Sequence, residues 1–93
     1  MTEKSIEQKL VVTVRSLGGI ALKFVSPGFD GVPDRLVLMP HGKIAFVELK
    51  AKGKKPRPLQ LKRKKQLEQL GFEVYIIDDK QMIGGVLDEI CSS

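Results

Sequence analysis

The sequence of 93 residues contains a single cysteine, Cys91, no tryptophan and only one tyrosine. One cysteine excludes an internal disulfide, so a disulfide-stapled secreted fold is not expected. No stretch reaches the roughly 20 consecutive apolar residues that a membrane-spanning helix requires. The first residues lead into an amphipathic stretch rather than an apolar signal segment. We therefore expect an intracellular, cytoplasmic protein that has no membrane partner.

Acidic residues are missing between positions 50 and 65, a stretch that holds nine of the sixteen basic residues. The formal net charge of the whole chain is +5. A stripe of one sign attracts polyanions, and nucleic acid is the commonest polyanion in a cell. The alternative is a solvated surface that only keeps the protein soluble. The basic stripe consists of Lys50, Lys52, Lys54, Lys55, Arg57, Lys62, Arg63, Lys64 and Lys65.

The apolar pattern predicts one α/β domain over residues 1–93, with the element order α-β-β-β-α-β-α. Helical spacing of apolar residues predicts a first helix from about residue 5, with Ser5 and Gln8 as a capping box, and further helices at 58–70 and after 79. Short apolar runs predict strands at 20–25, 35–39, 44–47 and 72–77. Residues 40–43 have the length of a hairpin turn, so the second and third strands should be antiparallel.

The small size of the chain limits the core that it can build. A core of this size is near the limit at which burial alone stabilises a fold, and a second subunit often supplies the rest. The apolar side of the last helix offers one surface for such a partner. A homodimer is therefore a reasonable expectation.

Two acids and a lysine occupy positions that core packing does not explain. Asp34 follows Gly31-Val32-Pro33, and Glu48 and Lys50 end the apolar run of the third strand. Alternation along a strand places Glu48 and Lys50 on one face, and the hairpin brings Asp34 beside them. Carboxylate oxygens suit Mg²⁺, which polarises a phosphate, and a lysine can stabilise the developing charge. The simplest interpretation is a metal site that cuts phosphodiester bonds.

Three further polar residues allow two interpretations each. Glu7, at the edge of the first helix's apolar face, is either a third acid aimed at the strand ends or a surface glutamate. Gln60 either orients a ligand or a lysine, or is an exposed residue of a first helical turn. His41 lies at the hairpin tip, where a solvated turn residue is favoured over a catalytic base.

These motifs resemble those of a known superfamily of nucleases. Asp34 followed by Glu48-Leu49-Lys50, in this order of elements, resembles the PD-(D/E)xK nucleases, and shorter features resemble their VRR-NUC branch. Those features are Gly31-Val32-Pro33-Asp34, Phe46-Val47-Glu48-Leu49-Lys50, Gln60 and Gly71-Phe72-Glu73-Val74. The valine-arginine-arginine run of the branch's name is not present, because Ser16 follows Val14-Arg15.

The resemblance implies a restriction-endonuclease-like αβββαβ core, with a mixed sheet flanked by helices. It also implies a Mg²⁺- or Mn²⁺-dependent phage or bacterial nuclease that cuts branched DNA, such as four-way (Holliday) junctions, as a homodimer. In that family the residues matching Asp34 and Glu48 bind metal together with the backbone carbonyl of Leu49. The residue matching Lys50 is catalytic, and those matching Glu7 and Gln60 complete the site, Glu7 as a further metal ligand.

The basic residues that follow the site are the predicted DNA contacts, and they would bind phosphates rather than read bases. They lie in the loop after the third strand and on the following helix: Lys52, Lys54, Lys55, Arg57, Lys62, Arg63, Lys64 and Lys65. Two alternatives remain open. One is a non-catalytic basic module that binds nucleic acid, and the other is a nuclease of the same fold that acts on flaps, ends or a specific duplex sequence.

Overall fold

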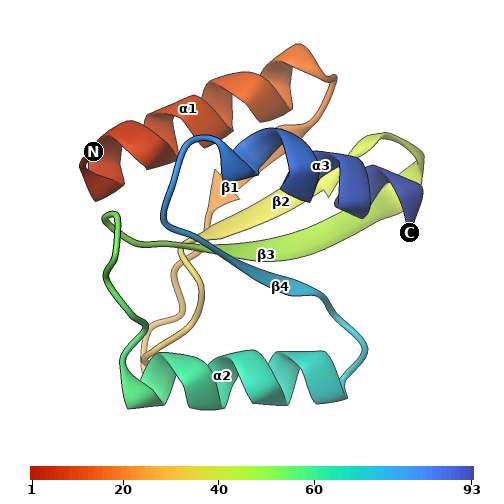
Figure 1. Cartoon of the computed structure of the whole chain (residues 1–93). Coiled ribbons are helices and arrows are strands. Elements are labelled where there is room, and N and C mark those ends of the chain that lie inside the picture. The colour runs from red at the N-terminus through yellow and green to blue at the C-terminus, as the bar shows by residue number, and fades with distance from the viewer.

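A computed structural model describes residues 1–93 as a four-stranded sheet with helices on both faces (Figure 1). Helices α1 and α3 cover one face of the sheet, and α2 lies on the other. The predicted order α-β-β-β-α-β-α is confirmed. The elements are α1 Glu3–Ser16, β1 Ile20–Lys23, β2 Arg35–Met39, a 3₁₀ turn Pro40–Gly42, β3 Lys43–Leu49, α2 Pro58–Gln69, β4 Val74–Ile77 and α3 Met82–Ser92.

The sheet is mixed, as expected, with the strand order β1-β2-β3-β4. Strands β1, β2 and β3 are antiparallel neighbours, and β4 runs parallel to β3. The β2–β3 hairpin is confirmed, and its register pairs Arg35 with Val47 and Leu36 with Phe46. The start of β2 therefore lies beside the end of β3.

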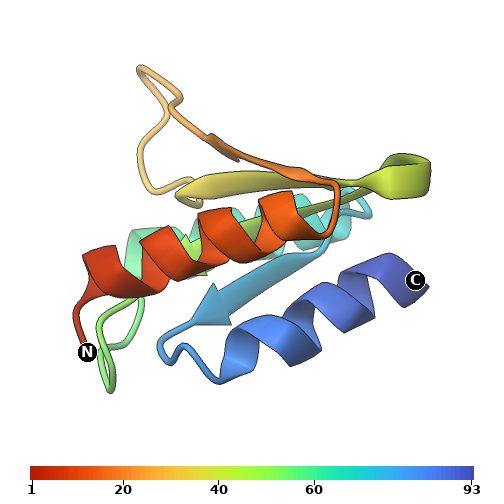
Figure 2. The ribbon, with the colours of Figure 1, turned by 90° about the horizontal axis from the view of Figure 1, so that it is seen from above.

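The hydrophobic core lies between the sheet and the helices α1 and α3, which run side by side (Figure 2). Ala45, Val47 and Leu49 of β3 point into this core, where they meet Ile6 and Leu10 of α1. Because side chains alternate along a strand, the even-numbered residues of β3 point to the opposite face, toward α2. This alternation places Glu48, near the end of β3, on the face of the sheet that α2 covers.

The first helix begins earlier than the sequence pattern predicts. Thr2 is its N-cap, and its side-chain oxygen accepts a hydrogen bond from the backbone N–H of Ser5 at 3.1 Å. Ser5 therefore lies in the first turn, and the predicted capping box of Ser5 and Gln8 is wrong. The threonine takes the role because any small hydroxyl residue just before a helix can satisfy its free N–H groups.

The last helix turns its apolar side toward the core of its own chain. Ile83, Leu87 and Ile90 are fully buried there, so this side of α3 is not available to a second copy. The predicted use of α3 as a dimer surface is therefore wrong. None of the helices has the length and apolar character that crossing a bilayer requires.

Candidate active site

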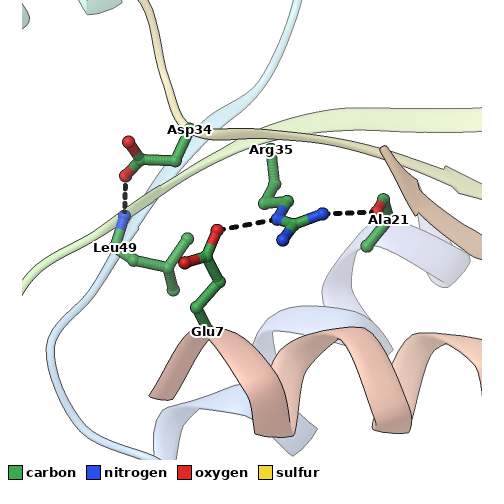
Figure 3. A network of polar contacts seen from close by, with 5 residues as sticks. All are labelled: Glu7, Ala21, Asp34, Arg35 and Leu49. Carbon is green, nitrogen blue, oxygen red and sulfur yellow. Dashed lines mark hydrogen bonds and ion pairs between the residues drawn. The ribbon is translucent and has the colours of Figure 1, made fainter. Parts of the chain in front are cut away.

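Asp34 reaches the end of β3, as the hairpin predicts. Its carboxylate oxygen Oδ2 accepts a hydrogen bond from the backbone N–H of Leu49 at 2.8 Å (Figure 3). Its carbonyl accepts a second bond from the N–H of Phe24, at 2.9 Å, which closes the loop between β1 and β2. The side chain is thus tied to the residue that follows Glu48.

Glu48 is the one charged residue in the buried interior of the protein, with 4% of its surface exposed. Neither of its carboxylate oxygens accepts a hydrogen bond. The ammonium of Lys50 lies 3.5 Å from Oε2, and the Lys50 side chain is itself largely buried. A buried carboxylate without hydrogen bonds is costly, so this arrangement is not explained by stability.

The pKa of Glu48 is raised from 4.5 to about 7, and burial is the largest cause. The negative charge of Asp34 is the second cause of the rise, and Lys50 opposes both effects. Glu3, in the first turn of α1, also raises the Glu48 pKa. Two carboxylates therefore share a weakly solvated space, and their mutual repulsion disfavours the charged form of Glu48.

The donor set at this place fits a hard divalent cation. The two free oxygens of Glu48 and the remaining oxygen of Asp34 are the ligand type that Mg²⁺ and Mn²⁺ prefer, and the backbone carbonyl of Leu49 is the neighbouring candidate. A cation would also relieve the repulsion that raises the Glu48 pKa. The chain forms no group of three or more His, Cys, Asp or Glu side chains that could hold a metal. Two side chains, backbone and solvent are thus the available ligands.

Glu7 is held by Arg35, the neighbour of Asp34 in the chain. It extends from α1, on the face of the sheet opposite to α2, and its Oε2 accepts a hydrogen bond from Arg35 Nε at 2.8 Å (Figure 3). Arg35 also donates to the carbonyl of Ala21 at 3.1 Å and so links α1, β1 and β2. Asp34 and Arg35 are consecutive in the chain, and alternation sends their side chains to opposite faces.

Gln60 lies in the same small pocket as Glu48. Its Oε1 accepts a hydrogen bond from the backbone N–H of Arg57 at 2.8 Å, which caps the start of α2. The amide thus has a structural role and is also beside the candidate site. The pocket is lined by Gly31, Pro33, Glu48, Pro56, Gln60, Lys64, Val74 and Ile76.

The predicted DNA contacts divide into two groups. Three of them have partners inside the chain: Lys52 pairs with Asp79 at 3.5 Å, Lys64 pairs with Glu68 at 2.8 Å, and Arg63 donates to the carbonyl of Asp30. The others are exposed and form no ion pair, and they are Lys54, Lys55, Arg57, Lys62 and Lys65.

Sequence reasoning missed Arg35, Glu3 and the inward contacts of Arg63. The alternation of the second strand could have indicated that Arg35 faces the first helix. No sequence signal marks the other two, since each depends on how a distant element packs.

Two comparisons with known proteins agree with this geometry. The chain is 56% identical over 80 residues to "Putative nuclease p44" of Acyrthosiphon pisum secondary endosymbiont phage 1, covering 86% of each protein. Its fold is similar to a solved "VRR_NUC domain", with a TM-score of 0.85 and 27% identity over 95% of this chain and 97% of that one. No family model matches the chain.

The mixed sheet, with an acid, a second acid and a lysine at neighbouring strand ends, defines a nuclease of the PD-(D/E)xK class. Within that class, the chain belongs to the VRR-NUC family.

Proposed function

We propose that this protein is a Mg²⁺- or Mn²⁺-dependent endonuclease that hydrolyses phosphodiester bonds in branched DNA, above all in four-way junctions, as a homodimer. It would act in the cytoplasm of a bacterial host cell, consistent with its phage relative. The observation that carries the proposal is the buried Glu48 carboxylate, which lies beside Asp34 and Lys50 without a hydrogen bond.

The roles of the residues follow from their positions. Asp34 and Glu48 would hold the cation together with the carbonyl of Leu49. When bound, such a cation supplies Lewis-acid chemistry, since it neutralises charge on the scissile phosphate and acidifies water. Lys50, held beside Glu48, would stabilise the negative charge that builds up during the reaction. Gln60 lines the pocket and would help to order polar groups within it.

The basic stripe supports a DNA substrate. The five exposed and unpaired basic residues lie in the loop after β3 and on α2, which is the face of the sheet that carries Glu48. Residues of this kind bind backbone phosphates without base readout, so the shape of the DNA rather than its sequence would select the substrate.

An exposed apolar surface on the sheet supports a homodimer. Ile20 and Leu22 of β1 are 57% and 45% exposed, and both point away from the core. The strand register places Ile20 beside Leu38 and Leu38 beside Ile44, so these side chains form a continuous row. We call this surface the open sheet face, and it consists of Ile20, Leu22, Leu36, Leu38 and Ile44. Exposed patches of this kind mark association surfaces.

The test is cleavage of a labelled panel of four-way junction, flap, nicked and linear duplex DNA, with and without Mg²⁺. We expect Mg²⁺-dependent cutting of the junction, and its loss, by at least about a hundredfold, in Asp34→Asn, Glu48→Gln and Lys50→Ala. The same variants should still bind the junction, because they leave the predicted DNA contacts from Lys52 to Lys65 unchanged.

Other outcomes distinguish the alternatives. Salt-sensitive binding without scission by any divalent ion would indicate the non-catalytic module. Cutting restricted to flaps or ends would indicate a different substrate for the same site. Full activity in all three variants would show that Asp34, Glu48 and Lys50 are not the catalytic residues.

A further inference from the structure

The loop between β1 and β2 carries Asp34 but has few attachments of its own. Its base is closed by the hydrogen bond from Phe24 N–H to the Asp34 carbonyl at 2.9 Å. Beyond that base, Val25 and Phe29 are exposed, and neither belongs to the hydrophobic core. The position of the loop must therefore come from contacts with another element.

Arg63 of α2 provides two such contacts. Its Nε donates to the carbonyl oxygen of Asp30 at 2.7 Å, and its guanidinium carbon lies 3.7 Å from the centre of the Phe29 ring. A second nitrogen donates to Oε1 of Gln66 at 3.0 Å, which holds the side chain in place along the helix. One guanidinium thus binds the backbone and the ring of the loop at the same time.

Close packing next to these contacts leaves little room for other arrangements. Gly31 has a φ of +87°, and a Cβ placed there would lie 2.7 Å from Leu59 Cγ and 3.1 Å from the Leu59 carbonyl. The loop backbone therefore rests directly on the first turn of α2. Helix α2 has no buried residue, and these loop contacts add to its packing against β4.

We propose that Arg63 is a positioning residue that fixes the Asp34 loop to α2, rather than a DNA contact like its lysine neighbours. The inference rests on the proposed function, since the position of Asp34 matters because of its place beside Glu48. Through Arg63 the element that carries the basic residues and the loop that carries the acid form one unit. Binding of DNA to α2 and the geometry of the acid pair are thereby linked.

The geometry requires arginine in particular. The planar guanidinium stacks on a ring while its edge donates in fixed directions, and an ammonium group cannot do both. A phosphate contact, by contrast, depends mainly on charge, and lysine often replaces arginine there. Arg63→Lys therefore distinguishes a positioning role from a phosphate contact, because it keeps the positive charge and removes the planar guanidinium.

The experiment compares Arg63→Lys, Phe29→Ala and the wild type. We expect Arg63→Lys to lower the junction-cutting kcat about tenfold and to raise the Mg²⁺ midpoint several-fold, with KM for DNA within about twofold of the wild type. Without metal, backbone amides of residues 28–34 should exchange hydrogen faster in both variants. The effects of the two substitutions should not add in the double variant, because they remove one shared contact.

Two matched variants on the same helix complete the design. Gln69→Ala, at an exposed residue whose side chain makes no hydrogen bond, should change none of these quantities. Lys62→Ala should raise KM without moving the Mg²⁺ midpoint. An Arg63→Lys variant with wild-type kcat, Mg²⁺ midpoint and hydrogen exchange would overturn the inference. If the wild type cuts no substrate, the proposed function is wrong. The hydrogen-exchange measurement still tests whether Arg63 fixes the Asp34 loop to α2.

Discussion

At the scale of single residues, Glu48 is the group that packing cannot account for. A glutamine of the same shape would avoid the cost of burying a charge, and yet the chain holds a carboxylate there without hydrogen bonds. Lys50 compensates only in part, since the pKa of Glu48 still lies well above its ordinary value. A buried carboxylate that destabilises the fold in this way is a candidate for a catalytic or metal-binding residue.

The metal-free protein should be less stable at high pH because of Glu48. Its pKa is about 7 in the folded state and near 4.5 when unfolded, so the folded state binds more protons between these values. The free energy of unfolding should therefore fall as the pH rises from about 4.5 to about 7, by about 2 to 3 kcal/mol relative to Glu48→Gln. Urea unfolding in EDTA at pH 5 and pH 8 measures the difference, and parallel pH profiles of the two proteins would contradict it.

At the scale of elements, α2 differs from the other two helices. Its sequence is too polar for a buried face, and none of its residues is fully buried. Gln60, Lys64 and Leu67 share the face that is half-buried, as their spacing predicts, and Arg63 joins them. Lys62 and Lys65 are exposed. The helix thus presents charge on one side while its other side completes the pocket around Glu48.

The exposed lysines of α2 should contribute to DNA affinity through phosphate contacts. We expect the double variant Lys62→Ala/Lys65→Ala to bind a junction more weakly and to reduce the slope of log K against log salt by about 2, since each phosphate contact contributes about 0.9. Fluorescence anisotropy at several salt concentrations measures the slope. Lys9→Ala, at an exposed lysine of α1 on the opposite face, is the control and should leave the slope unchanged. An equal loss of DNA affinity in the control would mean that binding depends only on the net charge of the protein.

At the scale of the whole molecule, the helices cover the two faces of the sheet to different extents. Helices α1 and α3 cover one face of the sheet completely enough to bury a core of twelve residues. On the other face α2 packs against β4 and leaves the β1 and β2 side open. Phe46 is buried on that face under Phe24 and Phe72, with ring centres 5.4 and 5.9 Å away, and the open sheet face begins beside it.

A charge on the open sheet face should separate the proposed dimer. We expect Leu22→Glu to be monomeric in sedimentation equilibrium and to lose paired cutting of a four-way junction, because burying an unpaired carboxylate in an interface is unfavourable. Val12→Glu is the matched control, since Val12 is 64% exposed on α1, away from that surface. A wild type that is monomeric with its DNA, or a dimeric Leu22→Glu, would contradict the assignment.

The sequence by itself determined the order of the elements, the β2–β3 hairpin and the shared face of Glu48 and Lys50. Each of these is local, because the period of two along a strand and the length of a turn set them without reference to distant residues. The resemblance in the motifs around Asp34 and Glu48 was sufficient to indicate the family, which the similar fold and the phage relative support.

The tertiary structure alone decided which side chains meet across elements. It joined Asp34 to the N–H of Leu49, paired Glu7 with Arg35, and placed Arg63 on the Asp34 loop. It also buried the apolar side of α3 and left the open sheet face exposed. These outcomes depend on how helices and loops pack against one another, and a one-dimensional pattern carries no information about such long-range contacts.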